Sequence, residues 1–213
     1  SATAVPGLCD MFTDRKLPSD FLKHLKALEK SYLAEKDPIR QCGFAGGPER
    51  WRQEREPILN AVETDGDLLD IGCANGFLLE CLVEWAGQRS IVLTPYGLDQ
   101  GIRLIELAKK RLPEYSSNLY TGDAWDWKPP RKFRYVYTLY DCVPPDFLEE
   151  YIRRMLLRMV CDGGRLIVGA YGSRSQKTPP FDIEGFLKCA GFSLQGKASG
   201  GNPPITSFVW IDK

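Results

Sequence analysis

Small and acidic residues follow successive apolar runs, where they could bind a nucleotide-like ligand. The run over residues 68–71 is followed by a loop, 72–76, with glycine at both ends, and Asp99 and Asp123 end the next two runs. Glycines let a backbone approach a ligand closely, and the start of the following helix offers unpaired N–H groups. A carboxylate roughly 20 residues beyond such a loop typically binds ribose hydroxyls. This pattern predicts a cofactor site.

The predicted elements would bring these residues to one edge of a sheet. From residue 68 onward strands and helices alternate, which is typical of a mostly parallel sheet with helices on both faces. Strands are predicted at 68–72, in a run ending at 99, and at 117–121, 133–139, 165–170, 192–197 and 205–211. Helices are predicted near 76–86, 101–112, 145–160 and 181–190. No helix separates the last two strands, so we expect them to form an antiparallel hairpin.

We predict two parts in this chain of 213 residues, an N-terminal arm and helical cap over 1–64 and a sheet domain over 65–213. Apolar residues recur at helical spacing after Ser19, its expected N-cap, which predicts a helix over 20–34. Pro48 is well placed to open a second helix that runs through Arg55. Residues 1–17 have little periodicity and are expected to form a loose or docked arm.

Composition limits the possible classes of protein. The 28 basic and 28 acidic residues balance, so no overall field favours nucleic acid or an anionic membrane. The scattered cysteines contain no C-x-x-C pair, which argues against a disulfide framework or a structural zinc site. They are Cys9, Cys42, Cys73, Cys81, Cys142, Cys161 and Cys189. This pattern fits a reducing cytoplasm, so we expect a cytoplasmic protein without a metal. No window approaches the roughly 18 apolar residues of a membrane span.

From residue 65 to the C-terminus the chain resembles the class I S-adenosylmethionine-dependent methyltransferases. Their first motif is similar to residues 68–76, Asp99 matches their acidic residue for the ribose hydroxyls, and Asp123 with Ala124 matches their adenine-binding pair. The resemblance implies a Rossmann-like, seven-stranded α/β fold and S-adenosylmethionine as cofactor, with S-adenosylhomocysteine as product. The residues it assigns to the cofactor are Asp70, Gly72, Cys73, Ala74, Asn75, Gly76, Asp99, Gln100, Asp123, Ala124, Trp125 and Tyr140.

The loop departs from the family pattern at Ala74, where a glycine is usual. Only a methyl group is added, so we expect Ala74 to keep a negative φ. The competing interpretation is a nicotinamide or flavin dinucleotide enzyme, whose G-x-G-x-x-G fingerprint would need glycine at Ala74 and at Phe77. The side chain of Ala74 would obstruct a pyrophosphate and that of Phe77 would crowd the helix-strand contact. The methyltransferase is therefore favoured.

Candidate acceptor-side residues follow the predicted strand 133–139. Methyl transfer from a sulfonium is a direct displacement, which chiefly needs alignment of the reacting atoms and exclusion of water. Tyr140 and Asp141 are the candidate catalytic residues, because they could orient or deprotonate an acceptor there. In the other interpretation Asp141 merely helps to end a strand before a helix. His24, the single histidine, is more typical of a surface position.

Two other groups of residues remain candidates. Trp51, Arg52 and Arg55 could bind substrate, and an arginine in this helix could pair with the carboxylate of the cofactor. An ordinary amphipathic helix would show the same pattern. Arg174 and Lys177, after the predicted strand 165–170, could meet an anionic acceptor or could simply be solvated. Trp125 could flank the adenine or pack in the core.

The sequence thus predicts a methyltransferase acting on a small-molecule acceptor through a nitrogen or oxygen nucleophile. A small acceptor is preferred because the chain has no basic tail and no net positive charge. The alternatives are an RNA or protein methyltransferase and a non-catalytic S-adenosylmethionine-binding regulator. The acceptor, the methylated atom and the oligomeric state do not follow from the sequence.

Overall fold

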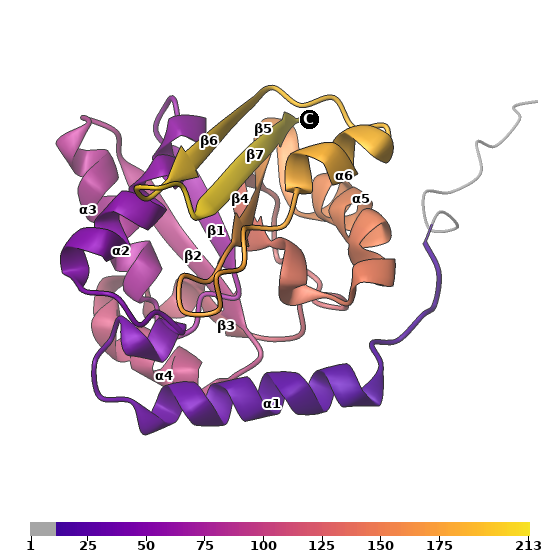
Figure 1. Ribbon diagram of the computed structural model, residues 1–213. Helices are drawn as coiled ribbons and strands as arrows, with labels where there is room; N and C mark the ends of the chain where they lie inside the picture. The colour runs from indigo at the N-terminus through magenta and orange to yellow at the C-terminus, as the bar shows by residue number, and fades with distance from the viewer. Residues whose placement is uncertain (1–11) are drawn as a thin grey trace, which may run out of the picture.

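The computed structural model describes residues 12–213, which surround a seven-stranded sheet (Figure 1). The strands are β1 (Gly66–Ile71), β2 (Leu93–Asp99), β3 (Leu119–Thr121), β4 (Phe133–Leu139), β5 (Val160–Tyr171), β6 (Gly196–Gly200) and β7 (Thr206–Asp212). Their order is β3-β2-β1-β4-β5-β7-β6. Strands β1 to β5 are parallel, and β7 is antiparallel to both β5 and β6. The predicted mostly parallel sheet with a terminal antiparallel hairpin is confirmed.

Helices cover both faces of this sheet (Figure 1). They are α1 (Ser19–Ala34), α2 (Pro48–Arg55), α3 (Phe77–Gln88), α4 (Ile102–Arg111), α5 (Leu148–Arg158) and α6 (Ile183–Cys189). One apolar core joins the sheet to α2, α3 and α4, and a second joins it to α5 and α6. Leu68 and Tyr137 belong to the first core, whereas Leu69 and Val136 belong to the second. The strands are apolar on both faces because both faces are buried.

Short 3-10 helices fill several connections. They are η2 (Arg40–Cys42), η3 (Glu56–Ala61), η4 (Pro113–Asn118), η5 (Tyr140–Cys142) and η6 (Pro145–Phe147). The predicted helix 145–160 therefore starts as η6 and becomes α-helical at Leu148. A proline has no N–H to donate, so Pro144 and Pro145 are confined to the approach to this helix.

Two local predictions were wrong. Ser19 is not an N-cap, because Pro18 occupies that position and no side chain caps α1. The strand predicted near 192–197 begins at Gly196 instead. The backbone N–H groups of Gly191 and Phe192 donate to Lys188 and Leu187, so this stretch first completes the end of α6. An apolar pattern cannot separate such a helix exit from the start of a strand.

The part of the predicted arm that the structure describes, residues 12–17, is docked against α5. The N–H and hydroxyl of Thr13 both donate to the carboxylate of Glu150, at 3.0 and 2.8 Å. The indole of Trp125 donates to the Arg15 carbonyl at 2.7 Å. The rest of the predicted arm, with Cys9, lies outside the described residues.

The cysteines of residues 12–213 form no disulfide. In this range Cys42, Cys73, Cys81, Cys142, Cys161 and Cys189 are free thiols. No described helix combines the length and the apolar character needed to span a membrane. Within the same range, no three His, Cys, Asp or Glu side chains are grouped so that they could hold a metal ion together.

The turn from β1 into α3 depends on a glycine at position 76. Gly76 has a φ of 75°, and a Cβ there would lie 3.0 Å from the Cβ and 3.2 Å from the Cα of Ala108 in α4. A side chain would therefore meet both an unfavourable backbone conformation and a close helix contact. Gly191 has a φ of 81°, but a Cβ there would have no atom within 4 Å. A substitution at Gly191 would therefore show the effect of the backbone conformation alone.

We predict that Gly76→Ala destabilises the protein more than Gly191→Ala. The left-handed conformation should cost about 1–2 kcal/mol in both variants. Overpacking against Ala108 should add about 1–3 kcal/mol in Gly76→Ala alone. Urea unfolding would measure both free energies. Equal losses would contradict the close approach of α3 and α4.

Candidate functional site

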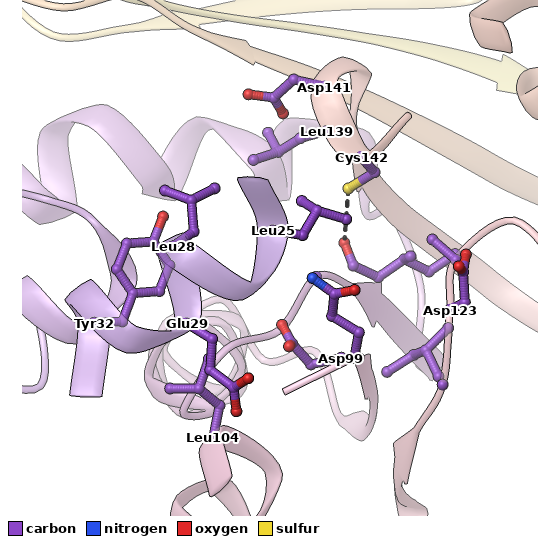
Figure 2. Close-up of a pocket in the computed structure, with 16 residues that line it drawn as sticks. Leu25, Leu28, Glu29, Tyr32, Asp99, Leu104, Asp123, Leu139, Asp141 and Cys142 are labelled. Atoms are coloured by element: carbon purple, nitrogen blue, oxygen red, sulfur yellow. Dashed lines mark hydrogen bonds between the residues drawn. The ribbon is translucent and has the colours of Figure 1, made fainter. Parts of the chain in front are cut away.

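Two adjoining cavities lie where the carboxyl ends of the parallel strands meet α1 and α2. The larger, of about 180 Å³, is roofed by α1 and floored by the loops that follow β1, β2, β3 and β4 (Figure 2). The smaller, of about 90 Å³, lies between α2 and the ends of β1, β4 and β5. Four residues line both cavities, namely Tyr32, Ile71, Gly72 and Leu139. The two cavities therefore adjoin at these four residues.

The loop over 72–76 forms the boundary of this region. The N–H groups of Gly72 and Cys73 donate to the Leu98 carbonyl at 2.8 and 3.1 Å, which ties the loop to β2. Gly72 has a φ of 87°, and a Cβ there would meet only Cys142 Sγ, at 3.4 Å. Gly72 therefore presents open backbone to both cavities, as a close ligand contact requires.

The prediction of a negative φ at Ala74 was wrong, because its φ is 47°. In this left-handed conformation the Ala74 N–H donates to Asp99 Oδ2 at 2.9 Å. The bond explains why the turn keeps a conformation that usually favours glycine. A methyl group is the smallest side chain that can adopt it, and Ala74 lies at the wall of the smaller cavity.

Asp99 and Gln100 line the larger cavity at the end of β2. Besides the bond from Ala74, Asp99 accepts one from the Gly101 N–H at 2.8 Å, so its carboxylate connects the loops after β1 and β2. Burial raises the pKa of Asp99, and the two N–H donors oppose that rise. The predicted ribose-binding carboxylate is thus positioned by both neighbouring loops.

Asp123 and Ala124 line the same cavity from the loop after β3. Asp123 Oδ1 accepts the Trp125 N–H at 2.7 Å, so this carboxylate also shapes its own turn. Burial raises its pKa. Trp125 lines neither cavity: its ring is only 2% exposed and packs edge-on against Phe147, with 4.9 Å between the ring centres. The structure therefore places Trp125 in the core.

Two predicted residues of the first loop contact protein instead of a cavity. Asn75 Nδ2 donates to the Pro38 carbonyl at 3.1 Å and to Gln41 Oε1 at 2.9 Å, and its Oδ1 accepts the Phe77 N–H. It therefore fastens the segment before α2 to the loop. Gly76 packs on α4, whereas Cys73 lines the smaller cavity.

Buried acidic and basic side chains line the smaller cavity. Asp70 is 2% exposed, and its Oδ2 has no hydrogen-bond partner. Burial and the nearby Asp99 raise the pKa of Asp70 to about 8. Arg55 is 5% exposed, and its guanidinium lies 3.6 Å from the ring centre of Tyr171, whose hydroxyl is 2.5 Å from that of Tyr137. Trp51 completes the wall.

Arg55 belongs to a cluster of arginines around one buried carboxylate. Glu54 is 4% exposed, and its Oε1 lies 3.1 Å from Arg50 and 3.2 Å from Arg174. Arg55 is farther away, 3.9 Å from Oε2. Arg55, which lines the smaller cavity, has the longest of the three contacts with Glu54, so its positive charge is poorly compensated. A carboxylate of a ligand could compensate it.

Other predicted basic residues point elsewhere. Arg52 lies on the outer side of α2, where it pairs with Glu56 at 2.7 Å and donates to Gln88 at 2.7 Å. Arg174 also donates to the Pro203 carbonyl at 3.0 Å. Lys177 lines a separate surface groove with Arg174. Of the three candidate substrate-binding residues on α2, the structure thus brings Trp51 and Arg55 to a cavity and leaves Arg52 outside.

Asp141 and Tyr140 lie in η5, at the end of β4. Asp141 lines the larger cavity (Figure 2), where burial raises the pKa of its carboxyl, and a backbone hydrogen bond and the nearby His24 oppose the rise. Tyr140 lines neither cavity, and its ring stacks on Phe181 with 4.6 Å between ring centres and 8° between planes. His24 is therefore near enough to Asp141 to influence it.

Several lining residues were missed by the sequence reasoning. Tyr32 lines both cavities, and burial together with Asp141 raises its pKa to about 12. Glu29 lines the larger cavity, whereas Tyr137 and Tyr171 line the smaller. Tyr32 belongs to the apolar pattern of a helix, and the other two tyrosines lie in strands. Their spacing in the sequence is the same for a side chain that lines a cavity and for one that packs in the core.

Comparisons with known proteins identify the fold. No protein-family model and no curated protein sequence matches the chain. Among solved structures it is similar to the N-methyltransferase NodS from Bradyrhizobium japonicum WM9 in complex with S-adenosyl-l-homocysteine. The TM-score is 0.65 and the identity 16%, over 88% of this chain and 96% of that one. The similarity extends to the DhpI-SAM-HEP complex, with TM-score 0.58 and 17% identity, over 95% and 100% of the two chains.

A third similar structure is an O-methyltransferase family 2 protein from Planctomyces limnophilus DSM 3776 in complex with apigenin. Its TM-score is 0.58 and its identity 12%, over 84% of this chain and 62% of that one. The protein has the class I S-adenosylmethionine-dependent methyltransferase fold.

We predict that Asp70 makes the stability of the ligand-free protein fall as the pH rises. An unfolded aspartate has a pKa of about 4. Because the folded value is raised to about 8, Asp70 contributes stability that is complete below about pH 4 and lost as the pH rises to 8. Asp70→Asn should remove this part of the decline, by at least about 1.4 kcal/mol, the value of one pKa unit.

Urea unfolding across this pH range would measure the effect. Glu106→Gln, at an exposed position on α4, is the control and should follow the wild type. Parallel curves for the wild type and Asp70→Asn would show that Asp70 is ionised in both folded and unfolded states, contrary to the expectation.

Proposed function

We propose that the protein is an S-adenosylmethionine-dependent methyltransferase acting on a small-molecule acceptor. The observation that carries this proposal is the pair of adjoining cavities: Asp99 and Asp123 line one, Asp70 and Arg55 line the other, and Gly72 lines both. Such an arrangement suits a ligand with a nucleoside at one end and an amino acid at the other. The structures of NodS and DhpI with S-adenosylhomocysteine or S-adenosylmethionine support the same cofactor here.

The larger cavity suits the adenosine part. Asp123 and the Ala124 N–H are the groups for the edge of the adenine, as the family resemblance implies. Asp99 would accept hydrogen bonds from the ribose hydroxyls. Each of its oxygens already accepts one backbone N–H, but a carboxylate oxygen has a second lone pair available.

The smaller cavity suits the amino-acid part. Arg55 would bind the carboxylate of the cofactor, which supplies the negative charge that the Glu54 cluster lacks. The unpartnered Asp70 Oδ2 is a suitable acceptor for the ammonium group, directly or through water. A nearby positive charge favours the ionised carboxylate, so ligand binding should lower the pKa of Asp70.

The residues of the chain would then control alignment and solvent. Bound S-adenosylmethionine supplies a methyl group activated by a sulfonium. Leu25, Leu28 and Tyr32 of α1 roof the larger cavity, so they can exclude water from the reacting atoms. Asp141 stands at the end of β4, where it can orient an acceptor or take its proton.

The size of the larger cavity and the helix that lies over it both favour a small acceptor. The larger cavity measures about 180 Å³, and α1 lies across it. Of the similar structures, one is named an N-methyltransferase and another holds apigenin, a small molecule. These comparisons support small-molecule methylation without separating nitrogen from oxygen acceptors.

We predict that Arg55→Ala weakens the binding of S-adenosylhomocysteine by about 10- to 150-fold. This range corresponds to the 1.5–3 kcal/mol of a hydrogen bond to a charged group. The variant should bind 5′-methylthioadenosine as the wild type does, because that compound has the same nucleoside but no amino-acid carboxylate. Titration calorimetry would measure both ligands.

The matched control is Arg52→Ala, which removes an arginine from the same helix but outside both cavities. Its affinity for both ligands should stay at the wild-type value. If wild-type protein bound neither S-adenosylmethionine nor S-adenosylhomocysteine, the proposed function would be wrong. If Arg55→Ala weakened both ligands equally, Arg55 would not be the carboxylate partner.

A further inference from the structure

The larger cavity has an unusual distribution of charge. Its lining contains the carboxylates of Glu29, Asp99, Asp123 and Asp141, which Figure 2 shows around the same space, and it contains no lysine or arginine. Over residues 12–213, none of these four carboxylates forms an ion pair. The buried Asp70 Oδ2 in the adjoining cavity is also without a partner. Both cavities therefore present unpaired acidic groups to a ligand.

The proposed cofactor accounts for Asp70, Asp99 and Asp123 and leaves two carboxylates of the larger cavity, Glu29 on α1 and Asp141 on η5. Asp123 and Asp99 would contact the adenosine, and Asp70 would contact the amino group. Asp141 lies elsewhere, at the end of β4, and lines the larger cavity together with residues of α1. An acceptor that contacts Asp141 would therefore lie in the space between η5 and α1.

An anionic acceptor has no partner in this space. Arg174 is occupied by Glu54 and the Pro203 carbonyl, and Lys177 lines a different groove. Arg52 lies outside on α2. His24, on α1, is the basic group that affects the pKa of Asp141. Asp141 would thus repel a carboxylate or phosphate bound near it. Arg52, Arg174 and Lys177 are not placed to offset this repulsion.

The opposite choice, a cation, fits both the charge and the neighbouring surface. Apolar side chains, among them Leu25, Leu28 and Leu139, line the same cavity as Asp141. Outside this lining, the next residue along the chain, Tyr140, stacks on Phe181, which is 38% exposed. Aromatic faces attract cations and accept apolar groups. A metal ion does not fit, because the described residues offer no group of three suitable ligands. The remaining candidate is an organic cation.

We propose that the acceptor is an amine attached to an apolar or aromatic group, and that Asp141 binds its ammonium form. This inference rests on the proposed function and specifies its substrate class. The ammonium gives one proton to the Asp141 carboxylate, and the freed nitrogen lone pair forms a bond to the methyl carbon. The carbon-sulfur bond breaks, and its electron pair stays on sulfur. The products are the methylated ammonium and S-adenosylhomocysteine.

The test compares two probes of similar shape and opposite charge, 2-phenylethylamine and 3-phenylpropanoate. Calorimetry on the protein saturated with S-adenosylhomocysteine should show the amine bound at least tenfold more tightly. In Asp141→Asn the two affinities should differ by less than about threefold, because the tenfold preference corresponds to about 1.4 kcal/mol of charge attraction. Asp126→Asn, at an exposed position outside both cavities, should keep the wild-type preference.

Failure of this inference is distinguishable from failure of the proposed function. If S-adenosylhomocysteine does not bind, the proposed function itself is wrong. If it binds but the two probes bind equally, the carboxylate binds more tightly, or neither binds at millimolar concentration, the amine inference is wrong. It is also wrong if Asp141→Asn keeps the preference for the amine and instead weakens S-adenosylmethionine relative to S-adenosylhomocysteine, since Asp141 would then serve the sulfonium.

Discussion

The hydrogen bonds from Ala74 and Gly101 to the Asp99 carboxylate hold the site together. They join the loop after β1 to the loop after β2, and the Leu98 carbonyl adds two further bonds to the first loop. The turn that results is left-handed at Gly72 and Ala74, so open backbone faces both cavities. Asp99 is itself a lining residue, so the group that would bind the ligand also positions the loop that would bind it.

Buried charge is the second feature that organises the site. Unpaired charges in a protein interior are costly, and they persist where a ligand can complete them. Here Arg55 and Asp70 line the smaller cavity; Arg55 shares the Glu54 carboxylate with two other arginines, and Asp70 Oδ2 has no partner. The opposite imbalances suit a zwitterion such as an amino acid. By the same reasoning, the carboxylates around the larger cavity that have no ion-pair partner over residues 12–213 favour a cationic acceptor.

The helices α1 and α2, from the N-terminal part of the chain, complete the walls of the two cavities at the ends of the strands. The helix α1 places Leu25, Leu28 and Tyr32 over the larger cavity, although none of its residues is fully buried. The helix α2 is more deeply integrated, because Trp51, Glu54 and Arg55 are all buried. Apolar periodicity predicted α1, and Pro48 at its start predicted α2. Which side chains of these helices would line a cavity depended on contacts with strands far away in the chain.

The sequence by itself determined the alternation of strands and helices, the terminal hairpin, and the positions of Asp70, Asp99 and Asp123 at strand ends. These features are local, because periodicity and turn residues act over a few neighbours. The tertiary structure decided that Arg55 faces a cavity while Arg52 faces solvent, that Trp125 is core, and that Ala74 is left-handed. Each of these depends on groups distant in sequence, such as Tyr171 beside Arg55 or Asp99 beside Ala74, which only the folded sheet brings together.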